Sequence, residues 1–325
     1  MADVFAYLEG FGASGGSPNK STIIVTAPTG STVTCKMGST TKTATEKNGV
    51  WTFGGLDLGT WTITSTKGGD SATQDVAITR LTVEYVTIVY RITPEFAYTG
   101  DYEIVDDSDN PISDFASWKN NWKIRFLTSG TLTFTKLNGW NGQLDVFLVG
   151  GGGNGETIRG ARGGGGGYTK TVKGISIAIA TPYTVTIGAS SGTSSAFGAS
   201  ANGASGANGG SGGGGGGSSS GTPGNGGSNG GNGTAGNVSQ GGAGQGTTTK
   251  EFGESTGKLY SGGGGGSAAG AGAAGDSTAG AGANFGGAAK NGVANTGGGG
   301  GAAYSGTAGR GGSGIVIARN ARGAA

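Results

Sequence analysis

The sequence lacks histidine altogether, holds a single cysteine and carries little charge. Among its 325 residues, 12% are Asp, Glu, Lys or Arg, and Cys35 is the one cysteine. Histidine is the commonest general acid or base and metal ligand, so its absence argues against the usual catalytic and metal sites. Cys35 has no internal disulfide partner and lies in an alternating run, where a small buried strand residue is expected. We therefore expect that the protein is not an enzyme and that it binds no cofactor and no metal.

Long apolar runs and clusters of basic residues are also missing. The formal net charge is only +2, and Lys and Arg do not gather on one element, so nucleic acid is not expected as a partner. No run reaches the length of a membrane span, and residues 1–16 lack the basic start and apolar stretch of a secretory signal. We expect neither membrane insertion nor a conventional secretion route.

Three patterns that suggest chemistry are each incomplete. The acidic run 106–111 lacks the closing Glu of a calcium loop and is interpreted as a solvated turn. Gly150, Gly152 and Gly155 match the spacing of a dinucleotide fingerprint, but no helical pattern follows them. A carboxylate pair between Asp101 and Asp114 is the one glycosidase alternative.

Glycine dominates what is present. It supplies 79 of the 325 residues, against an average of about 7%, and the hydrophobic share of 33% cannot fill an ordinary core in the second half. Between residues 203 and 236, glycines recur at every third position with one interruption at Ser218. Three residues per turn is the period of the left-handed extended helix, and the single Pro223 excludes collagen. The pattern predicts packed polyglycine-II helices in which the backbone forms the core.

A flexible Gly/Ser linker is the alternative interpretation. No charged residue occurs from Gly174 to Thr249, although charge usually keeps disordered chains solvated. Strand-like runs also interrupt the glycine region, and residues 314–319 close it with another. These features favour a folded domain.

Residues 21–92 have a period of two, with Thr-, Val-, Ile- and Trp-rich runs separated by turn residues, and therefore predict a small β-sandwich. The run 48–53 with Trp61–Thr64 resembles the immunoglobulin-like modules of surface and phage structural proteins. Residues 1–20 are interpreted as a docking arm and residues 93–122 as a connecting segment.

From Trp122 on, several motifs keep a fixed order: 122–134, 144–153, the glycine block 163–167 with Tyr168, 183–188, 194–198 and 311–317. This order resembles the glycine-rich domain of phage and prophage tail-fibre adhesins and other virion structural proteins. The resemblance implies a β portion that supports a polyglycine-II sandwich, with host contacts at loops of its tip. The expected fold class is therefore all-β plus a polyglycine-II helical bundle, with the glycine-rich domain over residues 123–325.

Polar loops that contain an aromatic residue are the candidate receptor contacts, because aromatics bury area at low entropic cost. The alternative is that these aromatics only cap the fold. The candidate residues are Arg159, Arg162, Lys250, Phe252, Glu254, Lys258, Tyr260, Asn284 and Phe285.

The function expected from the resemblance is a tail-fibre or tail-tip adhesin on the virion surface that binds a bacterial surface glycan or protein. The arm and the immunoglobulin-like module are expected to contact other virion proteins, in a chain that could form homo-oligomers. The alternatives are a non-adhesive tail or capsid decoration or spacer and an ice-binding protein, although the Thr residues are not regularly arrayed.

Overall fold

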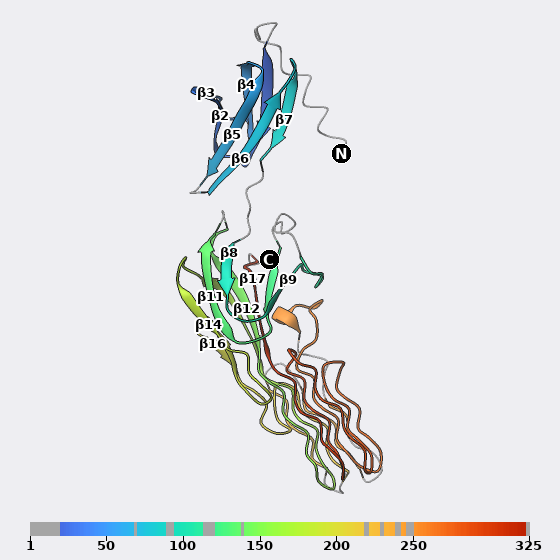
Figure 1. The fold of residues 1–325 in the computed structure, drawn as a ribbon. Helices are drawn as coiled ribbons and strands as arrows, with labels where there is room; N and C mark the ends of the chain where they lie inside the picture. Colours follow the sequence, from blue (N-terminus) through green and yellow to red (C-terminus); the bar gives the residue numbers. More distant parts are fainter. Residues whose placement is uncertain are drawn as a thin grey trace. The chain divides into compact units, whose positions relative to one another are not determined.

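The computed structural model describes residues 20–67, 70–88, 94–112, 121–137, 140–217, 221–227, 231–237, 242–244 and 250–322. The chain divides into two compact units, Met1–Ile92 and Thr93–Ala325, which are treated separately below (Figure 1). Apart from Lys20, the predicted docking arm lies outside the described residues.

The first unit is a β-sandwich. One sheet has the strand order β4-β1-β7 and the other β3-β2-β5-β6. Alternate residues of the strands are buried between the sheets, as with Ile23 and Val25 of β1, and Trp51, Phe53 and Trp61 fill the centre. The immunoglobulin-like character of this sandwich stays a prediction. The strands are β1 (Ser21–Thr26), β2 (Thr32–Met37), β3 (Thr40–Thr43), β4 (Val50–Leu56), β5 (Gly59–Lys67), β6 (Asp70–Ile78) and β7 (Val83–Thr87).

The second unit has a five-stranded antiparallel sheet of order β13-β12-β17-β10-β9, a three-stranded sheet of order β14-β11-β8 and the hairpin β15-β16. The predicted connecting segment 93–122 supplies β8 and β9, one edge strand for each of the two larger sheets. The strands are β8 (Glu95–Tyr98), β9 (Tyr102–Val105), β10 (Lys123–Phe126), β11 (Gly130–Lys136), β12 (Gln143–Val149), β13 (Thr169–Ser176), β14 (Pro182–Val185), β15 (Ser194–Ala196), β16 (Ala199–Ala201) and β17 (Ile315–Asn320).

The two faces of the five-stranded sheet carry different residues because side chains alternate along a strand. Leu144, Val146 and Leu148 of β12 enter the main core, which also holds Trp122 and Phe134. On the opposite face, Phe147 and Val149 of β12 join Ile315 and Ile317 of β17 in a second, smaller core. Residues 250–260, which include the 3-10 turn η3 (Glu251–Gly253), cover this opposite face, and we call them the covering segment.

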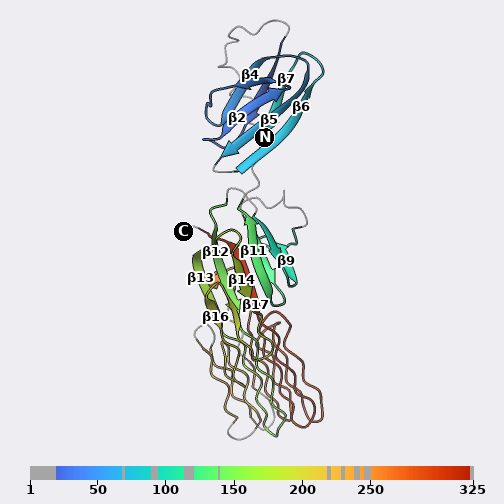
Figure 2. The ribbon, with the colours of Figure 1, turned by 60° about the vertical axis from the view of Figure 1, so that its left-hand side comes forward.

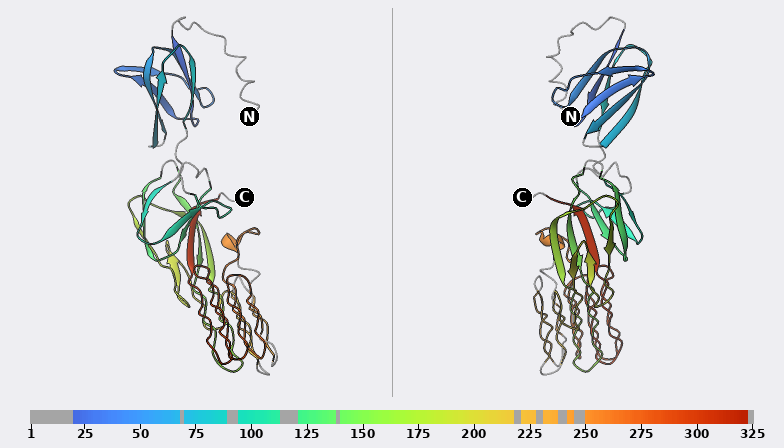
Figure 3. Two further views of the ribbon diagram at one scale, coloured as in Figure 1. Left: turned by 45° about the vertical axis from the view of Figure 1, so that its right-hand side comes forward. Right: turned by 90° about the vertical axis from the view of Figure 1, so that its left-hand side faces the viewer.

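The predicted polyglycine-II helical bundle is wrong. The described residues form an all-β structure in which η3 is the one short helical turn. The glycine segments run side by side away from the strands (Figures 2 and 3) and are joined by backbone hydrogen bonds between segments and by isolated β-bridges. The threefold glycine period therefore does not specify a helical bundle. The described part of the chain also holds no helix long and apolar enough to cross a membrane.

The period instead reflects how closely the segments approach one another. A Cβ atom added at Gly212, a member of the repeat, would lie against the carbonyl oxygen of Gly224, closer than the 3.0 Å limit that real Cβ atoms keep, and one at Gly224 would meet the carbonyl oxygen of Ala207. The amide of Gly164 donates to Gly300 O at 2.8 Å, and its carbonyl accepts from Gly264 N at 2.8 Å. Because each segment satisfies the backbone groups of its neighbours, the interior needs few apolar side chains.

Candidate functional site

The glycine segments extend from one end of the five-stranded sheet in the second unit. Gly150 directly follows β12, Tyr168 directly precedes β13, and Gly314 directly precedes β17. The backbone amides of Gly153 and Glu156 donate to Gly165 and Arg162, at 2.8 and 3.0 Å, so residues 150–167 form a long hairpin that turns at 157–161. This turn lies at the end of the glycine segments away from the strands, which we call the distal end (Figure 1).

Several hairpin turns meet at the distal end. The amide of Ser267 donates to Ala161 O at 3.0 Å, which joins the 268–270 turn to the 157–161 turn. The amide of Ala283 donates to Ala302 O at 2.8 Å, and that of Ala303 to Glu156 O at 3.0 Å. The turns at 157–161, 284–287 and 303–306 are therefore neighbours in space although they are far apart in the sequence.

These turns expose a group of larger side chains, which we call the distal surface. Phe285 is 67% exposed, and its ring lies 4.2 Å from that of Tyr304, centroid to centroid, with 30° between the ring planes. Ile158 is 60% exposed and follows Thr157, which forms a β-bridge with Ala303. The distal surface consists of Ile158, Arg159, Asn284, Phe285 and Tyr304.

An ion pair closes the 157–161 turn. The Arg162 guanidinium donates to Glu156 Oε1 from Nε at 3.0 Å and from Nη2 at 2.6 Å, and the Arg162 amide donates to Glu156 Oε2 at 3.0 Å. Burial alone would raise the pKa of Glu156, but these hydrogen bonds outweigh it and lower that pKa. Arg162 therefore stabilises the turn, and Glu156 neutralises its charge.

The covering segment lies at the strand end of the second unit. Tyr260 is fully buried and Phe252 is 5% exposed, and their rings lie 5.5 and 5.8 Å from that of Phe147. The amide of Glu251 donates to Lys258 O at 2.8 Å, which folds the segment back on itself. The aromatic side chains of this segment are thus part of the second core and are not available to a receptor.

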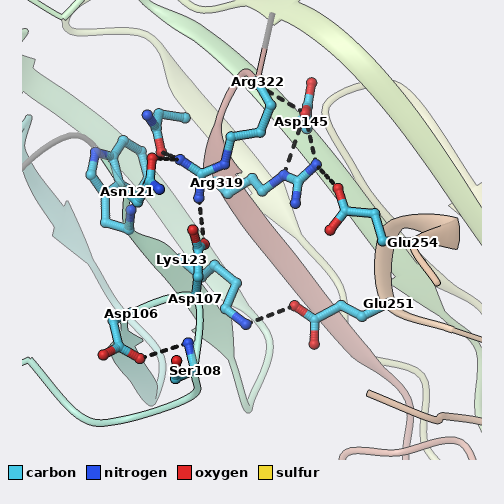
Figure 4. Close-up of polar contacts among 12 residues, drawn as sticks. Asp106, Asp107, Ser108, Asn121, Lys123, Asp145, Glu251, Glu254, Arg319 and Arg322 are labelled. Atoms are coloured by element: carbon cyan, nitrogen blue, oxygen red, sulfur yellow. Dashed lines mark hydrogen bonds and ion pairs between the residues drawn. The ribbon is translucent and has the colours of Figure 1, made fainter. Parts of the chain in front are cut away.

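Buried charges hold the covering segment to the sheet (Figure 4). Lys123 of β10 is almost fully buried and pairs with Asp109 at 2.6 Å and with Glu251 at 3.0 Å. Burial alone would lower the pKa of Lys123, but the two carboxylates outweigh burial and raise it. The Tyr260 hydroxyl donates to Glu251 Oε2 at 3.3 Å. Burial is the main cause that raises the pKa of Tyr260, and the charge of Glu251 adds to it.

Arg319 of β17 forms the other half of this network. Its Nη2 lies 3.3 Å from Asp145 Oδ2 and 2.6 Å from Glu254 Oε1, and its guanidinium carbon lies 3.9 Å from the centre of the Phe252 ring (Figure 4). The hydrogen bond from Arg319 lowers the pKa of Glu254. Within the ranges that the structure describes, no group of three or more His, Cys, Asp or Glu is arranged to hold a metal ion.

The structure separates the predicted receptor contacts into two groups. Arg159, Asn284 and Phe285 lie together at the distal surface, and Arg162 follows the 157–161 turn and forms its ion pair with Glu156. The other five belong to the covering segment. There Lys250 donates to Ser255 O, Glu254 binds Arg319, and Lys258 Nζ lies 5.8 Å from the centre of the Tyr260 ring. The five are Lys250, Phe252, Glu254, Lys258 and Tyr260.

Two members of the distal surface were not among the predicted contacts. They are Ile158 and Tyr304. Both stand between two glycine runs, and that position is the sequence signal that could have found them. The charged network has a comparable signal, because Asp145 and Arg319 each lie in an otherwise apolar strand-like run.

Comparison with known families is consistent with this geometry. The sequence model of a family described as a glycine-rich domain matches residues 127–321. The chain belongs to this glycine-rich domain family. The matched range begins directly after β10 and ends directly after β17, so the distal surface and the covering segment both lie within it.

Other comparisons add little about the glycine-rich domain. No curated protein matches the chain. A crystal structure of a DUF3823 family protein from Bacteroides ovatus matches with 13% identity over 56% of this chain and 94% of that chain, at a TM-score of 0.19. A likeness at this score supports no conclusion about fold or function.

Proposed function

We propose that this chain is a phage virion structural protein that acts as a tail-fibre or tail-tip adhesin and binds the bacterial host surface through the distal end of its glycine-rich domain. The observation that carries the proposal is the distal surface itself. Large apolar, aromatic and polar side chains are exposed together there, at the end of segments whose interior is almost entirely backbone. A structural spacer has no need of such a group.

The scaffold suits this role. The turns are fixed by hydrogen bonds between neighbouring segments, so side chains on them are held in place before a partner arrives. Such preorganisation lowers the entropic cost of binding. The proposed location is the virion surface, with the first unit in contact with other virion proteins.

A non-adhesive decoration or spacer is the second candidate, and one observation in the first unit favours it. β7 is an edge strand of its three-stranded sheet, and Val83 and Tyr85 on this strand are 48% and 64% exposed. An edge strand with exposed apolar side chains offers a ready docking surface for another chain. Such docking is compatible with adhesion, so the two candidates differ only in whether the distal end binds.

The test is to block the distal end without altering its chemistry. In the full chain, Ala288→Cys places a thiol on the exposed 284–288 turn, and Ile179→Cys places one at the end of the sheet away from the glycine segments. Each variant is labelled with a polyethylene glycol maleimide. Cys35 will not react, because it is buried and burial raises its pKa to about 11.

The readout is binding of the fluorescent chain to a panel of intact bacterial strains that includes the host range of related phages. We expect saturable binding that the polymer abolishes at position 288 and leaves unchanged at position 179. Equal binding by both labelled variants would refute distal attachment, and binding to no strain would favour the decoration.

A further inference from the structure

We propose that the ligand of the distal surface is a saccharide, and that the Phe285–Tyr304 pair is the platform on which a sugar ring stacks. This inference rests on the proposed adhesive function and adds the chemical class of the receptor. It depends on the geometry of the ring pair, on the way the turns are fixed and on the charge of the surface.

The ring pair has the geometry of a stacking platform. The centroids are 4.2 Å apart and the planes are tilted by only 30°, so the two rings lie nearly face to face. Phe285 is 67% exposed, so much of its ring is open to a ligand. The C–H face of a pyranose is flat and weakly apolar, and packing it on an aromatic ring removes apolar area from water on both sides.

The platform is rigid because both turns are tied to each other. The amide of Gly286 donates to Ser305 Oγ at 3.1 Å, next to Tyr304, and the amide of Gly287 donates to Asn284 O at 3.1 Å. A weak ligand such as a single sugar benefits most from a site that needs no ordering on binding. The rings are therefore positioned for stacking before a ligand arrives.

The polar groups around the rings suit hydroxyl groups better than strong anions. Asn284 and Arg159 are exposed, and an amide and a guanidinium together donate to and accept from sugar hydroxyls. Arg162 is already paired with Glu156. The exposed cation of this turn that lies outside the pair is Arg159. The surface therefore favours a neutral or weakly acidic saccharide.

The size of the surface argues against a folded protein as receptor. A stable protein interface buries about 800 Å² on each partner and depends on a central cluster of anchor residues. The large apolar side chains that the structure describes at the distal end are Ile158, Phe285 and Tyr304. One or two sugar rings match this area, and repeated units of a polysaccharide would supply avidity.

The first experiment uses the full chain and free monosaccharides, so it does not depend on knowing the host. Ring proton resonances of Phe285 and Tyr304 are followed by NMR during titration with a panel of neutral and acidic pyranoses at millimolar concentrations. We expect saturable shifts confined to these rings and to Asn284. If no pyranose shifts them, the proposal is wrong.

Substitutions then test the platform. In the full chain, Phe285→Ala and Tyr304→Ala each remove one ring, and Ile179→Ala removes an exposed apolar side chain at the opposite end of the sheet. We expect affinity for the best pyranose to fall about tenfold in each ring variant, as for loss of one good aromatic contact, and to be unchanged in Ile179→Ala. Phe285→Trp should restore binding, because it keeps a ring in place. Unchanged affinity in both alanine variants would overturn the platform.

A cell assay separates this inference from the adhesive function. Strains that bind the chain are treated either with periodate, which cleaves sugar diols, or with protease. Binding lost after periodate and retained after protease supports a saccharide. The reverse result would refute the saccharide and leave the adhesin proposal intact, whereas a chain that binds pyranoses but no cells would contradict adhesion alone.

Discussion

The distal surface and the covering segment are alike in sequence, but the aromatic side chains of the covering segment are buried and Phe285 of the distal surface is exposed. Both place aromatic residues in short polar stretches between glycine runs. Phe252 and Tyr260 are buried against Phe147, whereas Phe285 is exposed and its neighbouring ring is Tyr304. The difference follows from where each stretch falls along the back-and-forth course of the chain, because a turn next to the sheet meets apolar strands and a turn at the far end meets solvent.

The largest effect is expected from filling the backbone interior that separates these two regions. Gly164→Ala would drive a Cβ into the carbonyl of Gly153, which is fixed in the network of segments. We expect a loss of about 5 kcal/mol in the free energy of unfolding, the exceptional range for one substitution. Differential scanning calorimetry of the second unit's transition measures it.

Gly287→Ala is the matched control for that experiment. The nearest atom to its new Cβ is the Oδ1 of the Asn284 side chain, at 3.0 Å, and a side chain can move aside. A similar loss in both variants would mean that the close packing of backbones is not what requires glycine.

The aromatic residues give the next largest effect and test the comparison directly. Tyr260→Ala opens a cavity in the second core and should lower the free energy of unfolding by about 3 to 5 kcal/mol. Phe285→Ala removes an exposed ring and should change it by no more than about 0.5 kcal/mol. Denaturant unfolding of both variants measures the difference, and equal losses would contradict the division into a structural and an exposed group.

Removing the buried cation should follow in size. Arg319→Met leaves Asp145 buried without its ion pair and should lower the free energy of unfolding by about 3 kcal/mol. The loss is no larger because Asp145 still accepts from the amides of Gly174 and Arg322. Arg310→Met, at an exposed position on a glycine segment, should be neutral. Thermal unfolding compares them, and a neutral Arg319→Met would mean that the charges do not hold the covering segment.

The smallest effect is a dependence on pH. The hydrogen bond from Arg319 lowers the pKa of Glu254 below its usual value of 4.5, so the unfolded chain binds a proton at a higher pH than the folded chain does. This contribution to stability is present above the unfolded pKa and is lost as the pH falls through the folded one. The melting temperature of Glu254→Gln should therefore fall less between pH 6 and the acid range than that of the parent chain. Parallel slopes would contradict the assignment.

The sequence was sufficient for most of the strands, but not for β8 and β9 in the predicted connecting segment and not for the glycine region. The alternation of residues 21–92 and the apolar runs of β12 and β17 carry a period of two, which sheets also have. A glycine period of three matches the turn of an extended helix, but close packing of neighbouring segments also requires glycine, so the period alone does not specify a helix. Here the repeat reports where carbonyls of neighbouring segments approach, and those neighbours come from distant parts of the chain.

The candidate site was predictable only in part, because the turns that form it also come from distant parts of the chain. Phe285 and Arg159 could be chosen as aromatic and polar residues in irregular loops, but the same rule selected Phe252 and Tyr260. Which loops reach the distal end depends on hydrogen bonds such as that between Ala303 and Glu156, and no local pattern records these. The charges of Asp145 and Arg319 inside apolar runs were the one hint that the covering segment would be held down.

The place of β17 in the five-stranded sheet bears on how the protein can be made. β17 lies between β12 and β10, and its Arg319 reaches Asp145, 174 residues earlier in the chain. During synthesis, β10 and β12 therefore emerge long before the strand that joins them and must wait, with open edges, while all the glycine segments are produced. A chain interrupted anywhere in between would leave two strands with unpaired edges, so the sheet can close only on a finished glycine region, and incomplete copies are prone to aggregate.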